Sequence, residues 1–280
     1  MREVLEAALR AEAAGESVAL VTVVSTRGST PQKAGAKMLV HADGSLVGTI
    51  GGGCLEAEMT RRARQAIQER KVQLASYDLT PEEAGEDGLV CGGRMEVLIE
   101  PVEGTPVLCL FGAGHVAQPL ARMAKTCGFR VEVADDRVKF ANTQRFPEAD
   151  LVVVAGFVEA ARQMTLGPNT YAVIVTRGHK GDAEALQSVL GRDLRFVGLL
   201  GSKVKTVHIF SALAERGADR AALARVHAPL GIEIGAQTPE EIAVSILAEM
   251  IAIRRGVDPT RSASMKMALP ERLKPGSSIA

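Results

Sequence analysis

The sequence predicts an α/β protein, in which an N-terminal α+β domain is followed by a domain built on a doubly wound parallel sheet. One observation is a change of pattern near residue 103 of the 280. Before it, strands, a hairpin and helices follow in mixed order. After it, apolar strands alternate with helices, as in parallel sheets covered on both faces. The other observation is a hydrophobic content of 46%, enough for two cores, with only 3% aromatic residues.

The first domain is expected over residues 1–103. Its β-branched run at 18–24 predicts a buried strand, and Asp43-Gly44 predicts the tight turn of a hairpin. The further elements expected here are a helix over 5–14, hairpin strands at 37–41 and 45–50, a helix over 55–70, a strand at 72–77, an acidic loop over 80–88 and a strand at 94–100.

The second domain is expected over residues 104–256, with a linker over 101–106 leading into it. Thr238 and Pro239 predict the start of its last helix, because threonine caps helices and proline suits the first helical position. Residues 257–280 form a tail that we expect to be poorly ordered from Ser262 onward. Strands are expected at 106–111, 130–134, 151–155, 171–176 and 195–199, a mostly irregular connection after the second of them, and late helices over 203–216 and 239–255.

The composition excludes several classes of partner. The formal net charge is zero, with 33 basic and 33 acidic residues, which argues against a nucleic acid held by a basic face. No apolar run approaches the roughly 20 residues of a membrane span. The charged, amphipathic start lacks the apolar core of a signal peptide. We therefore expect a soluble cytoplasmic protein.

Three glycines beside a cysteine form the most informative motif, Thr49-Ile50-Gly51-Gly52-Gly53-Cys54-Leu55. Consecutive glycines permit positive φ and expose backbone N–H groups. Because a helix is expected to follow, Cys54 lies at or beside a helix N-terminus, where the dipole favours a thiolate and where phosphate or another anion binds. The motif predicts a site for catalysis, for binding a metal-containing group or for sulfur transfer.

A second cysteine has similar surroundings, since Cys91 precedes Gly92-Gly93 and the cation Arg94. If its loop converges with those of Ser29 and Cys54, they form a thiol-bearing anion pocket, and soft thiolates suit a soft or sulfur-ligated metal group. The alternative for both cysteines is a loop thiol without a function. The remaining thiols are expected in a buried strand and at a helix end, Cys109 and Cys127 respectively.

A possible nucleotide site lies in the second domain. Gly112-Ala113-Gly114-His115-Val116-Ala117 matches G-x-G-x-x-[GA], between an expected strand and an expected helix. This makes the domain Rossmann-like, with the two glycines and the histidine as candidate cofactor-binding residues. Asp135 and Asp136 come at the end of the next strand, where an acid hydrogen-bonds a ribose hydroxyl. Arg137 would instead suit a 2′-phosphate, so NAD and NADP both stay open, as does a turn kept for packing alone.

Two further loops follow expected strands at their carboxyl ends, where ligands bind in such sheets. One contains His179, which can act as an acid, a base or a phosphate ligand. The other contains Lys203 and Lys205. We expect His179 and Lys203 to contact the cofactor. The alternative is a pair of polar loops in which Asp182 caps a helix and the lysines are solvated.

Taken together, these motifs resemble the XdhC/CoxI family of accessory proteins for molybdenum hydroxylases, over nearly the whole chain to about Gly256. The motifs that carry the resemblance are Arg27 to Pro31, Gly35 to Met38, Gly48 to Glu56, Cys91 to Gly93, Phe111 to Ala117, Thr176 to His179 with Asp182, Gly198 to Lys203, and His227 to Ala243.

The resemblance implies a maturation factor that binds the molybdenum cofactor (molybdopterin), supports the exchange of an oxo ligand for sulfido, and delivers the product to an apo-hydroxylase such as xanthine dehydrogenase. A cysteine desulfurase would supply the sulfur. Under this hypothesis Cys54 coordinates molybdenum or carries a persulfide, Gly51, Gly52 and Gly53 supply backbone donors, and Cys91 is a second sulfur ligand or relay. A homodimer is expected. One further expectation is that the loops of the two halves face each other across a cleft, in which one pterin would contact both.

Two other functions stay open. One is an NAD(P)-dependent oxidoreductase with its nucleotide in the second domain and His179 or Cys54 near a substrate. The other is a thiol-dependent hydrolase with Cys54 as nucleophile, although no histidine is close in sequence. Turnover of NAD(P)H would favour the oxidoreductase, whereas activation of another protein without turnover would favour the accessory function. Whether the protein is an enzyme, and which hydroxylase it serves, also stay open.

Overall fold

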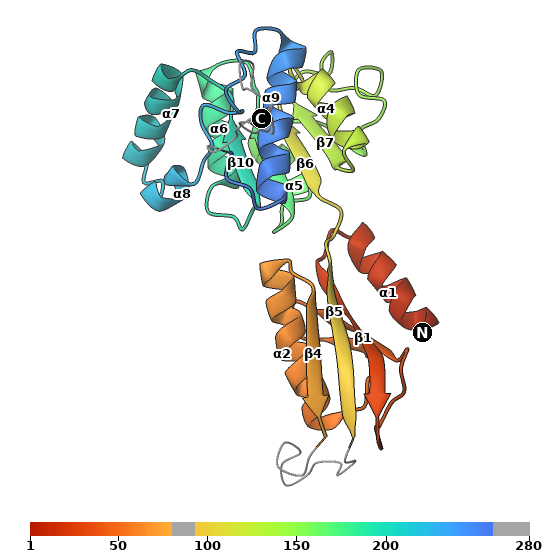
Figure 1. Cartoon of the computed structure of the whole chain (residues 1–280). Coiled ribbons are helices and arrows are strands. Elements are labelled where there is room, and N and C mark those ends of the chain that lie inside the picture. The colour runs from red at the N-terminus through yellow and green to blue at the C-terminus, as the bar shows by residue number, and fades with distance from the viewer. Residues whose placement is uncertain (80–92, 260–280) are drawn as a thin grey trace, which may run out of the picture.

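A computed structural model of the chain describes residues 1–79 and 93–259, and these form two sheets with their helices, one half above the other in Figure 1. The predicted order, an α+β domain before a doubly wound parallel sheet, is confirmed. The sheet of the N-terminal half is antiparallel and contains, in spatial order, β3 (Leu46–Gly48), β2 (Lys37–His41), β1 (Val18–Arg27), β5 (Arg94–Val102) and β4 (Gln73–Asp78).

Two helices cover opposite faces of the antiparallel sheet. Helix α2 (Gly53–Glu69) buries Leu55, Met59 and Ala63 against one face. These residues recur every four positions, which is the spacing of one side of a helix. Helix α1 (Arg2–Ala13) packs on the other face over β2 and β3, so that the outer face of β5 and β4 has no helix above it among the described residues.

The predicted hairpin is confirmed. Met38 of β2 lies opposite Gly48 of β3, and the Asp43 carboxylate accepts a hydrogen bond from the Ser45 N–H at 2.8 Å. The linker expected over 101–106 is wrong at its start, because β5 continues to Val102 and Pro101 lies opposite Ala19. Proline is tolerated here because β4 begins opposite Ile99 and does not extend alongside Pro101, so no neighbour on that side needs its missing N–H.

The C-terminal half contains a sheet in which every pair of neighbouring strands is parallel. The strands predicted from apolar runs are confirmed, and every residue of β6 and β9 is buried, as expected of strands covered on both faces. In spatial order the strands are β10 (Phe196–Leu199), β9 (Thr170–Ile174), β6 (Val107–Phe111), β7 (Arg130–Asp135) and β8 (Leu151–Val154).

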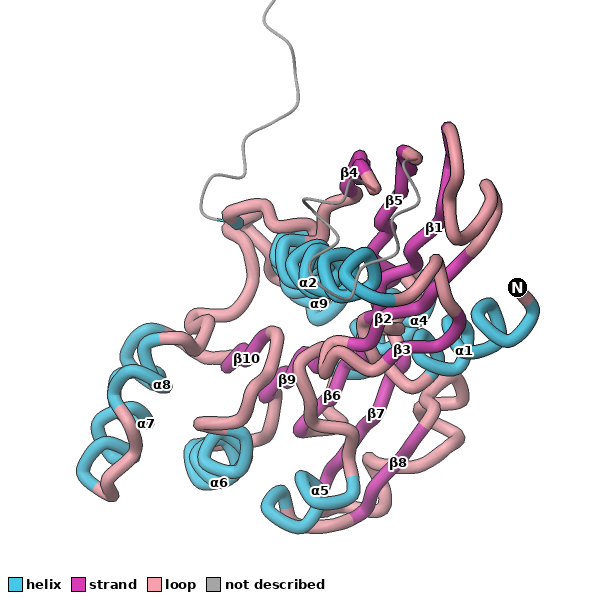
Figure 2. Tube along the Cα trace, turned by 90° about the horizontal axis from the view of Figure 1, so that it is seen from below, coloured by secondary structure: helices cyan, strands magenta, loops and turns pink. Residues whose placement is uncertain are grey.

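Helices cover both faces of the parallel sheet (Figure 2). Because β6 is followed by β7 on one side and flanked by β9 on the other, the switch point where ligands bind in such sheets lies between β6 and β9. The connection between β7 and β8 is irregular, as predicted. One face carries α4 (Ala117–Thr126) and α9 (Pro239–Arg254), and the other carries α5 (Phe157–Gln163), α6 (His179–Val189) and α7 (Lys203–Glu215), with the short α8 (Arg220–Ala224), which the sequence did not predict.

The last helix begins as the sequence predicts. The Thr238 hydroxyl accepts a hydrogen bond from the Glu241 N–H at 3.2 Å, and the Glu241 carboxylate accepts one from the Thr238 N–H at 3.0 Å. This reciprocal capping box satisfies N–H groups that have no partner within a helix. It fixes the start of α9, which packs on α4 over the core of the second half.

The two halves meet where α2 ends and where the parallel strands begin. Arg70, which follows α2, donates a hydrogen bond to the Arg254 carbonyl at 3.4 Å and lies 3.6 Å from Glu103. Arg70 and the first residues of β6 and β9, Val107 and Thr170, line one cavity of about 720 Å³. The start of α2 and the carboxyl ends of the parallel strands therefore lie at opposite ends of the molecule (Figure 1).

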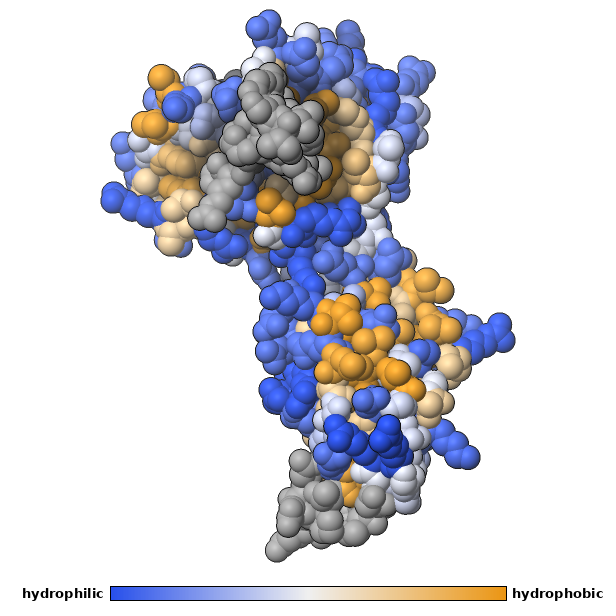
Figure 3. Space-filling view, viewed as in Figure 1, coloured by the Kyte–Doolittle hydropathy of each residue, from blue (hydrophilic) through white to orange (hydrophobic). Residues whose placement is uncertain are grey.

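Apolar side chains gather on the visible face of the N-terminal half (Figure 3). Val72, just before the edge strand β4, is 63% exposed, and Leu74 on β4 is 67% exposed, as is Leu9 on α1. A patch of this kind is typical of a surface that contacts another protein. Across the residues that the structure describes, no helix is both long and apolar enough to cross a membrane.

Candidate functional site: a glycine–cysteine turn and a Rossmann-like edge

The glycine–cysteine turn leads directly into α2, and the predicted place of Cys54 at a helix N-terminus is confirmed. Gly51, Gly52 and Gly53 have φ angles of 140°, 77° and 59°, which other residues rarely adopt. A Cβ added at Gly51 would also lie 2.5 Å from Cγ of Pro31. Cys54 is the second residue of α2 and is exposed. The turn thus presents this side chain to solvent at the far end of the molecule.

The N–H groups of this turn face an anion that belongs to the chain itself. Oε1 of Glu56 accepts hydrogen bonds from the Thr49 hydroxyl, the Ile50 N–H at 3.0 Å and the Gly51 N–H at 3.3 Å. Partial burial would raise the pKa of Glu56, but these donors and the Gly52 N–H hold that pKa below its ordinary value. The Glu56 carboxylate therefore lies where the sequence predicts that a phosphate or another anion binds, at the N–H groups of the turn.

Glu56 is not among the predicted site residues, although it ends one of the family motifs. A usable signal was present, because a carboxylate in the first turn of a helix that follows a glycine turn can reach back to the free N–H groups. The sequence suggested that the turn binds the anion of a ligand, whereas in the structure the anion is the carboxylate of Glu56.

Two of the three loops expected to converge around the thiols do so. Pro31 contacts Gly51, and a Cβ at Gly93 would lie 2.2 Å from the carbonyl oxygen of Ser29, so the 27–35 loop lies between the cysteine turn and the start of β5. Cys91 and the acidic loop over 80–88 fall outside the described residues. The roles predicted for Cys91 stay predictions.

The second glycine turn, after β6, is confirmed as the connection between a buried strand and a helix. Gly112 has φ 110°, and a Cβ there would lie 2.5 Å from the carbonyl oxygen of Val175, because the end of β9 passes directly beside it. At Gly114 nothing lies within 4 Å of an added Cβ. The first glycine therefore serves the close approach of two strands, and the second leaves open space at the switch point.

Asp135 ends β7, as predicted, but its carboxylate is 1% exposed and turned inward. It accepts hydrogen bonds from the Ala113 N–H at 2.9 Å and from Nε and Nη2 of Arg137 at 2.7 and 2.8 Å. Burial would raise the pKa of Asp135, but these bonds hold it below its ordinary value. Asp135 and Arg137, two of the candidates for nucleotide recognition, are thus engaged with each other. The side chain of the third candidate, Asp136, is 56% exposed.

The carboxyl ends of β9 and β10 carry the other predicted residues. His179 begins α6 and Lys203 begins α7, and both are exposed. The rings of His179 and His208 contact each other at 5.8 Å between centroids. The structure thus places His179 and Lys203 at the edge where Gly112 and Gly114 also lie.

Lys205 differs from Lys203, because its ammonium forms an ion pair with the fully buried carboxylate of Asp182. Asp182 also accepts a hydrogen bond from the Thr176 hydroxyl at 2.7 Å. The pair joins the first turns of α6 and α7. Asp182 therefore does not cap a helix, as the alternative interpretation supposed, since α6 already begins at His179.

The remaining cysteines lie as expected. Cys109 is buried within β6, and burial, followed by the adjacent Glu132, raises the pKa of its thiol. Cys127 follows α4 and is exposed. Within residues 1–79 and 93–259, no three His, Cys, Asp or Glu side chains lie close enough to form a metal site.

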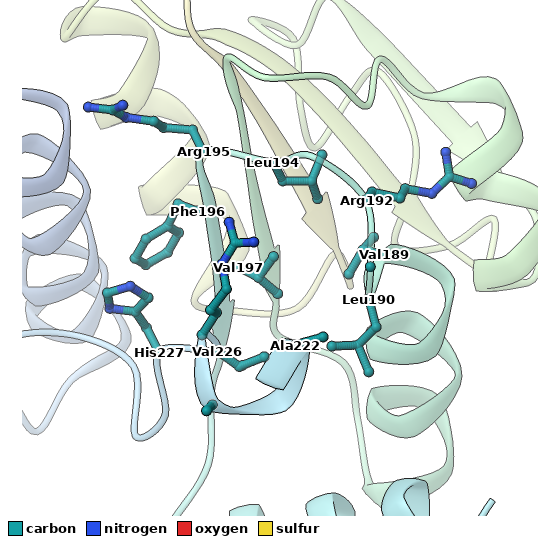
Figure 4. A pocket seen from close by; sticks show the side chains of 13 residues that line it. Val189, Leu190, Arg192, Leu194, Arg195, Phe196, Val197, Ala222, Val226 and His227 are labelled. Atoms are coloured by element: carbon teal, nitrogen blue, oxygen red, sulfur yellow. The ribbon is translucent and has the colours of Figure 1, made fainter. Parts of the chain in front are cut away.

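A cavity of about 400 Å³ lies beside the edge strand β10 (Figure 4). Its wall includes His227, whose Nδ1 is 2.7 Å from Oε1 of Glu249, and whose ring lies 4.5 Å from that of Phe196 between centroids. Glu249 also accepts a hydrogen bond from the Gly231 N–H at 2.6 Å. Glu249 belongs to none of the predicted sites, although an acid within the apolar stretch of α9 suggests a buried partner. Neither this cavity nor the one between the halves is lined by Cys54 or by a glycine of either turn.

The two predicted sites do not face each other across a cleft. Helix α2 has 17 residues and is therefore about 25 Å long, and Cys54 lies at its end away from the second half. Gly112 lies at the end of β6 away from the first half. A single pterin cannot span both turns within one copy of the chain.

Comparison with known proteins identifies relatives for both halves. The sequence profile described as the XdhC Rossmann domain matches residues 108–250, and the one described as the XdhC and CoxI family matches residues 11–78. A crystal structure of a protein named xanthine dehydrogenase from Bacillus halodurans has a TM-score of 0.50 and 25% identity, covering 93% of this chain and 98% of that one.

Three curated proteins are also similar. The uncharacterized protein YqeB of Escherichia coli (strain K12) is 39% identical over 84% of this chain, which spans only 43% of YqeB. A probable xanthine dehydrogenase subunit of Bacillus subtilis (strain 168) is 25% identical, covering 86% of this chain and 94% of that protein. The molybdenum cofactor insertion chaperone PaoD of Escherichia coli (strain K12) is 22% identical, covering 90% and 88%.

Proposed function

Because the chain belongs to the XdhC family, we propose that it is an accessory protein that binds the molybdenum cofactor and inserts it into a hydroxylase of the xanthine dehydrogenase type. The names of two relatives, one a molybdenum cofactor insertion chaperone and the other part of a probable xanthine dehydrogenase, support this proposal. In this function the cofactor is cargo, and the protein acts by holding it and releasing it to an apo-enzyme rather than by turnover.

The single observation that carries the proposal is the presentation of Cys54. Its side chain is exposed at the first turn of α2, on a glycine turn that is already formed by hydrogen bonds within the chain. A thiolate is a soft ligand that suits molybdenum bound by a dithiolene. An exposed position at the end of the molecule suits a ligand that must be passed to another protein.

We propose two roles for Cys54, to be separated by experiment. It ligates the molybdenum of the cargo, or it carries a persulfide whose outer sulfur becomes the sulfido ligand. The second step requires two electrons from a reductant such as a small thiol, and it releases the Cys54 thiol and the oxo ligand as water. Sulfuration requires a sulfur donor, and a cysteine desulfurase remains the proposed one. Cys91 remains the proposed second ligand or relay, and its neighbour in the described part of the chain, Gly93, lies beside the same 27–35 loop.

The phosphate of the cargo is assigned away from the cysteine turn, because Glu56 fills that turn. His115, His179 and Lys203 at the Rossmann-like edge remain proposed cofactor-binding residues, together with Gly112, Gly114 and Asp135. They would hold NAD(P), or a pterin bound apart from Cys54, because one pterin cannot span both turns. Asp135 would act there by supporting the turn through the Ala113 N–H.

An NAD(P)-dependent oxidoreductase is the second candidate, favoured by the open space at Gly114 on the switch point. The inward-facing Asp135 speaks against the usual contact with a ribose. Oxidation of NAD(P)H by the purified protein with a small substrate would support this candidate over the accessory function.

We also propose a homodimer whose contact is the apolar face around Leu74 and Val72, because these side chains are exposed on the outer face of the sheet that no described helix covers. The client hydroxylase is the other protein that this face would suit. The molecular mass in solution, measured for the wild type and for Leu74→Lys, distinguishes a homodimer from a face that binds the hydroxylase.

The accessory function is tested by activation of a purified apo-hydroxylase supplied with molybdenum cofactor. We expect the wild-type protein to increase the rate or yield of activation, Cys54→Ser to lose most of this effect, and Cys127→Ser to retain it, since Cys127 is the matched exposed cysteine beside α4. Equal activation by the wild type and Cys54→Ser would contradict the role given to Cys54.

A further inference from the structure

The acceptor of the glycine–cysteine turn is a single carboxylate oxygen. Oε1 of Glu56 takes hydrogen bonds from a hydroxyl and two backbone N–H groups that precede α2, those of Thr49, Ile50 and Gly51. Thr49 also accepts a bond from the Gly51 N–H at 3.2 Å, so the residues of the turn are linked to one another as well as to the carboxylate. Hydrogen bonds to an ionised acceptor are stronger than those between neutral groups.

We propose that Glu56 is a positioning residue that keeps this turn closed and thereby presents Cys54, and that the turn does not bind the phosphate of a ligand. A glycine turn before a helix is an anion site because its N–H groups need an acceptor. Here the acceptor is the Glu56 carboxylate, which belongs to the same chain. An incoming phosphate would have to displace this group, which is negatively charged like the phosphate itself.

The positions of the two side chains on α2 explain how Glu56 acts on Cys54 without competing with it. Residues two apart on a helix are turned by about 200° from each other and do not face one another. Glu56 reaches back over the turn and is half-buried, whereas Cys54 is exposed. The same carboxylate also lies at the positive end of the helix dipole, which favours its ionised form.

Glu58 offers a matched control on the same helix. Its carboxylate pairs with side chains further along α2, Arg61 at 2.8 Å and Arg62 at 2.7 Å, rather than with the turn. Removing it changes the charge of α2 by the same amount as removing Glu56. An effect of Glu56 that Glu58 does not share is therefore an effect on the turn.

The test compares wild type, Glu56→Ala, Glu56→Gln and Glu58→Ala by hydrogen exchange at Ile50 and Gly51 and by the alkylation rate of Cys54, read by mass spectrometry. We expect Glu56→Ala to speed amide exchange roughly tenfold or more and to change the alkylation rate. Glu56→Gln should be intermediate, because its amide oxygen still accepts, and Glu58→Ala should match the wild type. Acetate should restore both readouts in Glu56→Ala, whereas chloride at equal ionic strength should not.

Inorganic phosphate separates the proposal from its alternative. We expect phosphate to leave the exchange of Ile50 and Gly51 unchanged in the wild type. Phosphate-dependent protection in the wild type, or unchanged exchange and alkylation in Glu56→Ala, would overturn the proposal. If Glu56→Ala does not fold, Thr49→Val removes one donor instead and should shift both readouts in the same direction by less. Amide exchange and Cys54 alkylation need no molybdenum. Their outcome therefore tests the role of Glu56 separately from the proposed binding of molybdenum cofactor.

Discussion

Arg137 holds the carboxylate of Asp135 with two parallel hydrogen bonds, from Nε to Oδ1 at 2.7 Å and from Nη2 to Oδ2 at 2.8 Å. Oδ2 also accepts the Ala113 N–H of the glycine turn. The guanidinium is stacked on the Phe140 ring, 3.8 Å from its centroid. Asp135, which the sequence predicts to bind a ribose, thus stabilises the glycine turn after β6 through the Ala113 N–H.

This relationship predicts a pH-dependent contribution to stability. Because the folded-state pKa of Asp135 is lowered, its contribution is complete above the ordinary aspartate pKa of about 3.9 and is lost as the pH falls through the folded-state value. We expect Asp135→Asn to reduce the free energy of unfolding by roughly 2–4 kcal/mol at neutral pH. Urea unfolding should show this difference shrinking below a pH of about 4. A difference that does not change with pH would contradict the ionic origin.

The two glycines of the second turn should respond differently to the same substitution. Gly112→Ala places a Cβ 2.5 Å from the Val175 carbonyl at φ 110°, which should cost about 2–5 kcal/mol. Gly114→Ala meets nothing within 4 Å and should unfold like the wild type. Thermal unfolding of both variants checks this pair. Equal stability of the two would show that β9 does not approach the turn this closely.

The ion pair of Lys205 with Asp182 predicts a structural role for this lysine. Lys205→Met leaves a buried carboxylate without its partner, which should cost about 3–5 kcal/mol, whereas Lys203→Met at the exposed neighbour should have little effect on unfolding. Adding Asp182→Asn to Lys205→Met should recover part of the loss. Chemical denaturation of the three variants tests this, and a double variant less stable than Lys205→Met would speak against it.

The apolar face of the first half predicts self-association. We expect the wild type to sediment as a dimer and Leu74→Lys to sediment as a monomer, because a charge at the centre of an apolar contact is not compensated. Val204→Lys is the matched control, since Val204 is 81% exposed on α7 in the other half. A monomeric wild type would assign this face to another partner.

Most of the fold follows from local patterns in the sequence. The apolar runs of β6 and β9, the Asp43-Gly44 turn and the Thr238 cap each depend on residues close in the chain, and each is confirmed. The extension of β5 through Pro101 is not local, because it depends on where the neighbouring strand β4 begins. The ends of strands are determined by pairing between segments that are distant in the sequence.

The site was predicted less completely, because its chemistry depends on which groups find each other in space. The sequence correctly placed Cys54 at a helix N-terminus and Asp135 at a strand end. It did not predict that Glu56 accepts hydrogen bonds from the turn before Cys54, or that Arg137 pairs with Asp135. Nor did it predict that the two turns lie at opposite ends, since this depends on the directions of α2 and β6 at the junction.

The central claim is that the protein holds the molybdenum-bearing cargo, with Cys54 as the ligand of its molybdenum, the first of the two roles proposed for this residue. The most direct measurement is the molybdenum and pterin content of the purified protein after incubation with molybdenum cofactor and removal of the excess, for the wild type, Cys54→Ser and Cys127→Ser. We predict near-stoichiometric molybdenum on the wild type and on Cys127→Ser, and little on Cys54→Ser. Equal retention by Cys54→Ser, or none by any of the three, would contradict the account.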